Sequence, residues 1–138
     1  MKVYCDGGSR GNPGPAACGY AIEENGKVIK QGGRYLGTAT NNVAEYYGAI
    51  EGLKALEELK SLPSLVTFVH DSELIARQLM GIYKIKNENL RELYLTAKNI
   101  EKNLSAKITY ISVPRSHNKI ADYLVNKYLD ESIQTNTD

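Results

Sequence analysis

The sequence of 138 residues is poor in the features that mark disulfide-rich and membrane proteins. Its two cysteines, Cys5 and Cys18, are too few for a disulfide scaffold or a four-thiolate zinc site. Both fall in segments expected to be strands, so we expect buried free thiols. No apolar run approaches the roughly 20 residues that cross a bilayer, and no signal-peptide pattern opens the chain. We therefore expect no membrane association and a cytoplasmic protein.

A strong excess of charge of either sign is also missing. The formal net charge is +1, from 17 Lys and Arg residues against 16 Asp and Glu residues. Strongly basic chains indicate nucleic-acid binding, and this balance gives no such indication. Any binding of nucleic acid must therefore come from locally placed groups, and the motifs have to carry the functional argument.

The hydrophobic pattern predicts a single α/β domain. Asn25-Gly26 between two strand-like runs predicts a hairpin, and the Gly- and Pro-rich residues 6–15 predict a loop. Three antiparallel strands followed by helix-separated strands imply a five-stranded mixed sheet flanked by helices. We expect a domain of residues 1–131 and a polar, frayed C-terminal tail at 132–138. The expected strands are 2–6, 17–23, 27–35, 65–70 and 107–113, and the expected helices are 43–60, 72–80, 88–103 and 118–131.

Four acidic residues lie at the predicted ends of these elements. Asp6 and Asp71 end the first and fourth strands, and Glu45 and Asp122 lie near the starts of two helices. Each also has a purely structural explanation. Asp6 can shape a turn, and Asn42 can form a capping box with Glu45. Asp71 can cap the following helix, and Asp122 can be a solvated acid near a helix start.

Taken together, the four acids favour a metal site. Gly48, Ala49 and Gly52 give the first helix a small-residue surface, so the helix can lie close to the sheet and bring Glu45 toward Asp6. Clustered carboxylates need compensating cations, and all-oxygen ligation suits Mg²⁺ or Mn²⁺ rather than zinc. Two ions roughly 3.5–4 Å apart would suit in-line attack on a phosphodiester, with one activating water and the other stabilising the departing 3′ oxygen.

Four segments, in order, resemble the motifs of the type 1 ribonuclease H family. Residues 6–15 (DGGSRGNPGP) resemble the family's opening motif, and residues 40–45 (TNNVAE) resemble its T-N-x-x-A-E motif. Asp71-Ser72 after an apolar strand resembles the third motif, and residues 113–122 resemble the closing V-P-R…N-x-x-A-D form. The resemblance covers nearly the whole chain, and four motifs in sequence are strongly specific.

The resemblance implies a ribonuclease H-like fold and an endoribonuclease that cuts the RNA strand of RNA/DNA hybrids, leaving 5′-phosphate and 3′-hydroxyl ends. It implies two Mg²⁺ ions, with Mn²⁺ as a possible substitute, and a monomer. The hybrid is the expected partner, with double-stranded RNA as an open alternative. The implied metal-binding and catalytic residues are Asp6, Glu45, Asp71 and Asp122. The implied substrate contacts are Ser9, Gly11, Asn12, Asn41 and Asn42 in the minor groove, and Thr40 at a DNA phosphate.

Two segments depart from the family pattern. The loop before Asp122 is shorter than in members that carry a histidine there, and Arg115 lies near its start, where a forked cation suits a phosphate or leaving group. The Trp-rich basic protrusion that some members carry after the second helix is missing. Lys84, Lys86 and Arg91 could replace it in part, which predicts a modest and salt-sensitive affinity for the hybrid.

Three alternatives share parts of this pattern. A module that binds hybrids without cutting them usually lacks one or more of the acids, and all four are present. A DNA-directed resolvase or transposase core shares the acids, but the TNNVAE segment favours a reader of 2′-hydroxyls. A phosphatase with an aspartyl nucleophile usually needs a second Asp two residues after the first, and that position is Gly8.

Overall fold

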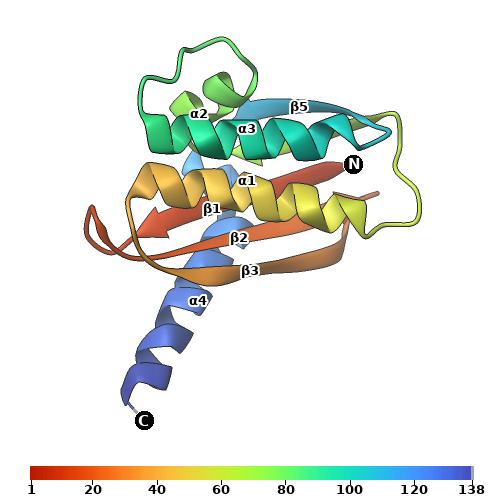
Figure 1. Ribbon diagram of the computed structural model, residues 1–138. Coiled ribbons are helices and arrows are strands. Elements are labelled where there is room, and N and C mark those ends of the chain that lie inside the picture. Colours follow the sequence, from red (N-terminus) through yellow and green to blue (C-terminus); the bar gives the residue numbers. More distant parts are fainter. Residues whose placement is uncertain (138) are drawn as a thin grey trace.

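The antiparallel half of the sheet is built around one tight turn, as the sequence predicts. Asn25 and Gly26, with φ of 52° and 77°, join β2 (Gly14–Glu24) to β3 (Lys27–Ala39). β1 (Lys2–Ser9) pairs antiparallel with β2 and parallel with β4 (Leu65–His70), which in turn pairs parallel with β5 (Lys107–Ser112). The computed structural model, which describes residues 1–137, thus contains a five-stranded mixed sheet in the order β3-β2-β1-β4-β5 (Figure 1). This is the predicted fold class.

Helices cover both faces of this sheet. They are α1 (Asn41–Glu57), α2 (Glu73–Leu79), α3 (Glu88–Lys102) and α4 (Lys119–Thr137), with a short 3₁₀ turn, η1 (Arg115–His117), before α4. On one face α1 packs against β1 and β2 and against α3, and on the other face α4 packs against β1, β2 and β3 (Figure 1). The larger core lies beneath α1 and α3, and a smaller cluster of Ala17, Val125 and Leu129 lies beneath α4.

The first strand is longer than predicted, and this changes the place of Asp6. We expected the strand to end at Asp6 and a loop to follow, but β1 continues to Ser9. Its continuation is held by β2, where Gly7 faces Cys18 and Ser9 faces Ala16. The partner strand, which the local Gly-rich sequence does not reveal, keeps this segment extended. On the other side of β1, pairing with β4 runs only from Lys2 to Tyr4. Asp6 therefore lies inside a strand, at a point where one neighbouring strand has ended.

The first helix lies against β1 at two glycines, which confirms the predicted close approach. A Cβ added to Gly48 of α1 would lie 2.5 Å from the backbone oxygen of Asp6. A Cβ added to Gly7 of β1 would lie 2.0 Å from the carbonyl carbon of Ala44. Any side chain at either position would push the helix from the strand, so this contact sets the distance between Glu45 and Asp6.

The last helix is also longer than predicted. α4 continues to Thr137, whereas we expected it to end at residue 131 and to be followed by a frayed tail. Residues 132–137 contain no Gly or Pro that would end a helix, and Ser132 Oγ donates a hydrogen bond to the carbonyl oxygen of Leu129. The expected tail at 132–137 is therefore helical, and residue 138 lies outside the described residues.

Two expectations about the rest of the chain can be compared with the structure. Cys5 and Cys18 are buried free thiols, as predicted. Among the described residues 1–137, no helix combines the length and the apolar character that a membrane span requires.

Substitution of Gly48 by Ala tests the close approach of α1. We expect the Gly48→Ala variant to lose about 1–3 kcal/mol of unfolding free energy in urea denaturation, because the added methyl group overlaps the backbone of Asp6. Gly8→Ala is the control, since a Cβ there would meet Val125 Cγ1 at an ordinary 3.5 Å. Equal stability of the two variants would show that the α1 contact is not tight.

Candidate active site

Three of the four predicted acids converge at the open end of β1. Asp6 comes from within β1, Asp71 directly follows β4, and Glu45 comes from the first turns of α1. One carboxylate oxygen from each residue lies within 4.8 Å of those from the other two. Asp6 and Glu45 are only 5% and 8% exposed. The first three predicted ligands therefore form one group, in which Asp6 and Glu45 are buried and Asp71 is half-buried.

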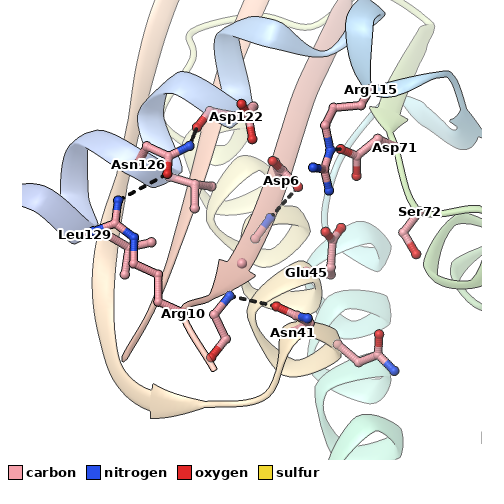
Figure 2. Close-up of a pocket in the computed structure, with 15 residues that line it drawn as sticks. Asp6, Arg10, Asn41, Glu45, Asp71, Ser72, Arg115, Asp122, Asn126 and Leu129 are labelled. Carbon is pink, nitrogen blue, oxygen red and sulfur yellow. Dashed lines mark hydrogen bonds and ion pairs between the residues drawn. The ribbon is translucent and has the colours of Figure 1, made fainter. Parts of the chain in front are cut away.

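The fourth acid, Asp122, faces the same cleft from α4. The cleft has a volume of about 550 Å³, and all four acids line it. In Figure 2, Asp6 lies between Asp122 on one side and Glu45 and Asp71 on the other. Asp122 is not a member of the tight group of three. The start of its helix is held to β1 by Asn118, whose Nδ2 donates to the carbonyl oxygen of Cys5 at 2.9 Å.

The capping explanations for two of the acids are wrong. Thr40 caps α1, with its Oγ1 accepting from the Val43 backbone N–H, so no capping box of Asn42 and Glu45 starts this helix. Ser72 caps α2, with its Oγ accepting from the backbone N–H of Ile75, so Asp71 does not serve that purpose. The side chains of Glu45 and Asp71 are therefore free to face the cleft.

Burial and mutual repulsion make the cluster unfavourable as a set of bare anions. Burial, together with the negative charge of Glu45, raises the pKa of Asp6 from 3.8 to about 9. Burial also raises the pKa of Glu45 from 4.5 to about 8, and the charge of Asp71 acts in the same direction. The protein has therefore placed acids where their charged forms need a cation.

The donor set fits a hard divalent cation. Among the described residues, Glu45 Oε2 and Asp71 Oδ2 are buried oxygens without a hydrogen-bond partner. Asp71 Oδ2 has one cation nearby, Arg115 Nε at 3.5 Å, and the Arg115 side chain is 80% exposed. Buried carboxylate oxygens without partners are what an all-oxygen Mg²⁺ or Mn²⁺ site requires. The residues present thus suit such an ion.

The polar residues expected to contact substrate interlock beside the carboxylates. Asn41 Oδ1 accepts from the backbone N–H of Ser9 at 2.8 Å, and Asn12 Oδ1 accepts from the backbone N–H of Asn41 at 3.1 Å. Ser9 Oγ donates to the carbonyl oxygen of Gly11. These bonds hold the β1–β2 loop to the start of α1. Of the expected contact residues, Ser9, Asn41, Asn42 and Arg115 line the carboxylate cleft.

The remaining expected contacts lie to one side. Asn12 and Thr40 line a neighbouring hollow that Asn41 and Asn42 share with the main cleft. Gly11, with φ of 112°, lines neither of these two and serves as a turn residue. Apart from Gly11 and Arg115, the residues expected to contact substrate thus line two adjoining hollows, and we call them the polar wall.

Three residues near the site were not predicted to have a functional place. Asn118 belongs to the closing motif, where no role was assigned to it, and its hydrogen bond connects the start of α4 to β1. Arg10 lines the cleft and forms an ion pair with Asp130 of α4 at 2.8 Å. His70 is fully buried, and its Nδ1 lies 3.8 Å from Glu45 Oε2. Burial lowers the pKa of His70 to about 4, so the ring is neutral. Side chains alternate along a strand, and His70 points to the face of the sheet on which α1 packs.

Comparison with known proteins gives the family. A family model described as reverse transcriptase-like matches residues 4–128. A ribonuclease H of Coxiella burnetii is 30% identical over 153 aligned positions, which cover 97% of this chain and 92% of that protein. The chain belongs to the type 1 ribonuclease H family. The resemblance drawn from the four motifs is therefore confirmed.

Two further relatives are longer than the present protein. Ribonuclease HI of Halobacterium salinarum is 37% identical over 134 positions, covering 96% of this chain and 65% of that protein. A bifunctional protein of Mycobacterium tuberculosis is 39% identical over 139 positions, covering 98% of this chain and 37% of that protein. The chain thus spans between about one third and two thirds of the length of these relatives.

Solved structures agree in fold over nearly the full chain. The N-terminal RNase H domain of the Mycobacterium tuberculosis protein superposes with a TM-score of 0.88 at 37% identity, covering 97% of this chain and 96% of that domain. The LC11-RNase H1, solved in complex with an RNA/DNA hybrid, superposes with a TM-score of 0.90 at 37% identity, covering 96% and 98%. The ribonuclease H-like architecture is therefore shared in full.

The raised pKa values predict how the metal-free protein responds to pH. An acid whose pKa is raised by folding binds its proton more tightly in the folded protein, so it stabilises the folded state at low pH. This stabilisation is lost as the pH rises from the pKa of the unfolded chain to that of the folded protein, here from about 4.5 to about 9. Asp6→Asn removes the repulsion, so in EDTA we expect it to be more stable than the wild type at pH 9 by at least about 1.4 kcal/mol, with a smaller gain at pH 5.

Chemical denaturation at the two pH values measures this difference. Glu57→Gln, an exposed acid at the far end of α1, is the control and should match the wild type at both. An Asp6→Asn variant no more stable than the wild type at pH 9 would show that the carboxylates do not repel one another in the folded protein.

Proposed function

We propose that this protein is an endoribonuclease that hydrolyses the RNA strand of RNA/DNA hybrids and leaves 5′-phosphate and 3′-hydroxyl ends. The observation that carries the proposal is the convergence of Asp6, Glu45 and Asp71 within 4.8 Å, with two buried oxygens that have no hydrogen-bond partner in the described part of the chain. The same residues lie in the opening, second and third motifs of the ribonuclease H family. The relative solved with an RNA/DNA hybrid supports the substrate class.

The four acids would hold the metal ions that the reaction needs. Asp6, Glu45 and Asp71 form the tight group of three, and Asp122 reaches the same cleft from α4. Two Mg²⁺ ions, or Mn²⁺ in their place, supply an activated water and neutralise the charge on the departing 3′ oxygen when bound. Because the acids belong to the sheet, α1 and α4, their positions are fixed before substrate binds.

The protein's own polar groups would select and orient the hybrid. Ser9, Asn41 and Asn42 line the cleft beside the acids, with Asn12 and Thr40 next to them. Short polar side chains and backbone groups suit recognition of 2′-hydroxyls in a shallow minor groove, which distinguishes RNA from DNA. Glu45 adjoins this wall, so it is placed to accept a hydrogen bond from a 2′-hydroxyl as well as to hold metal.

Cleavage of a hybrid labelled on each strand in turn tests the proposal. With Mg²⁺ we expect cutting of the RNA strand alone, and we expect Asp71→Asn to lower kcat by at least about 10²-fold while the protein stays folded. Glu57→Gln, which exchanges an acid for an amide far from the cleft, should cleave like the wild type.

The products and a second substrate complete that experiment. Ligation requires a 5′-phosphate and a 3′-hydroxyl, so ligatable products would identify the ends. Double-stranded RNA in a parallel reaction decides whether the substrate class is wider. Tight binding of the hybrid with no cleavage in either Mg²⁺ or Mn²⁺ would mean that the protein is a binding module, and the proposal would then be wrong.

Arg115 has a separate prediction because its guanidinium is exposed beside Asp71. A forked cation there suits either the departing oxygen or a phosphate of the substrate. Arg115→Ala is expected to lower kcat/KM for the hybrid by about 10²-fold, with Arg115→Lys restoring part of the loss. A fall in kcat would indicate the departing oxygen, and a rise in KM would indicate phosphate binding. Unchanged kinetics, equal to those of the exposed control Lys60→Ala, would exclude both roles.

A further inference from the structure

Cys5 and His70 are among the buried groups that the proposed reaction does not use. The register of the parallel β1–β4 pair explains why they meet. Tyr4 lies opposite Val69, so the next residue of each strand brings Cys5 beside His70, directly before Asp6 and Asp71. Both residues are 0% exposed, and Cys5 Sγ lies 3.1 Å from His70 Nε2. The two strands that supply metal-binding acids therefore also supply a thiol–imidazole pair beneath them.

The other nitrogen of the imidazole faces a metal-binding acid. His70 Nδ1 lies 3.8 Å from Glu45 Oε2. This oxygen is buried, and it has no hydrogen-bond partner among the described residues. His70 thus connects a thiol on one side with an oxygen of Glu45 on the other.

The thiol decides which ring nitrogen carries hydrogen. A thiol has one proton, and three possible acceptors lie near Cys5 Sγ: His70 Nε2 at 3.1 Å, the carbonyl oxygen of Val69 at 3.7 Å and His70 Nδ1 at 3.8 Å. The shortest contact is with Nε2. When the thiol donates to Nε2, the hydrogen of the neutral imidazole lies on Nδ1 and faces Glu45. An N–H directed at a carboxylate favours its charged, metal-binding form.

We propose that His70 is a positioning residue for Glu45, with Cys5 fixing the tautomer of its ring. His70 touches neither metal nor substrate in this account. It orients the Glu45 carboxylate electrostatically from within the core, at 3.8 Å, a longer distance than the hydrogen bonds that orient metal ligands in other sites. The proposal rests on the proposed function only in taking Glu45 as a metal ligand.

Titration calorimetry of the whole protein with Mg²⁺ tests this without relying on catalysis. Loss of a group that orients a metal ligand commonly weakens metal binding or activity 10- to 100-fold, so we expect His70→Leu to bind Mg²⁺ at least about tenfold more weakly. The half-saturating Mg²⁺ concentration for cleavage should rise by the same factor. KM for the hybrid at saturating Mg²⁺ should stay unchanged, because the polar wall of the cleft is intact. His70→Gln keeps an amide N–H and should recover part of the affinity.

A matched control separates positioning from general loss of stability. Val66→Ala removes methyl groups from the fully buried core of the same strand, away from the carboxylates. It should lower stability while leaving Mg²⁺ affinity at the wild-type value. A merely structural role for His70 would give His70→Leu the same behaviour as Val66→Ala.

The cysteine gives a second pair of variants if His70→Leu does not fold. Cys5→Ser keeps a donor for Nε2 and should bind Mg²⁺ nearly like the wild type, whereas Cys5→Ala should bind it more weakly. Wild-type affinity in Cys5→Ala would overturn the proposed role of the thiol.

The outcomes also distinguish this inference from the proposed function. A wild-type protein that binds no Mg²⁺ and cuts no hybrid would overturn the proposed function. A wild type that binds and cuts, alongside a folded His70→Leu with unchanged Mg²⁺ affinity, would overturn the positioning role alone.

Discussion

The contact of α1 with β1 at Gly7 and Gly48 is the constraint on which the site depends. The added Cβ atoms would lie 2.0–2.5 Å from backbone atoms of the opposing element, so no other residue pair fits without moving the helix. Glu45 directly follows Ala44, whose carbonyl faces Gly7, and it is therefore held beside Asp6 by the backbone itself. Carboxylates brought together in this way repel, and the packing of the fold has to hold them.

That packing is supplied by other residues of the same helix and the residues around it. Tyr46, Ile50 and Leu53 of α1 are buried in the larger core, and Tyr46 Oη donates to Gln78 Oε1 at 2.7 Å. Burial of large apolar side chains stabilises a domain by about 1.5–3 kcal/mol each. The helix that holds Glu45 beside Asp6 is thus itself anchored by the larger core.

Local sequence patterns predicted the features that local chemistry determines. Asn25-Gly26 gave the hairpin, and the small residues after Glu45 gave the close helix. The predictions that were wrong concern residues whose interaction partners lie elsewhere in the sequence. β1 continues past Asp6 because β2 pairs with it, and the capping residues of α1 and α2 are Thr40 and Ser72 rather than the acids. The contact of His70 with Glu45 could not be predicted, because it depends on α1 packing on the face of the sheet toward which His70 points. No spacing in the sequence shows which face that helix covers.

The fourth acid differs from the other three in what holds it. Asp122 belongs to α4, which lies on the other face of the sheet and rests on a separate, smaller core. Polar contacts connect this helix and the residue before it to β1 and the loop that follows. Asn118 donates to the Cys5 carbonyl oxygen, and Arg10 contacts both Asn126 and Asp130. Arg10 lies between Ser9 and Gly11, in the segment expected to read the substrate. The loop after β1 is therefore bonded to the helix that carries Asp122, whereas Asp6, Glu45 and Asp71 come from the sheet and α1.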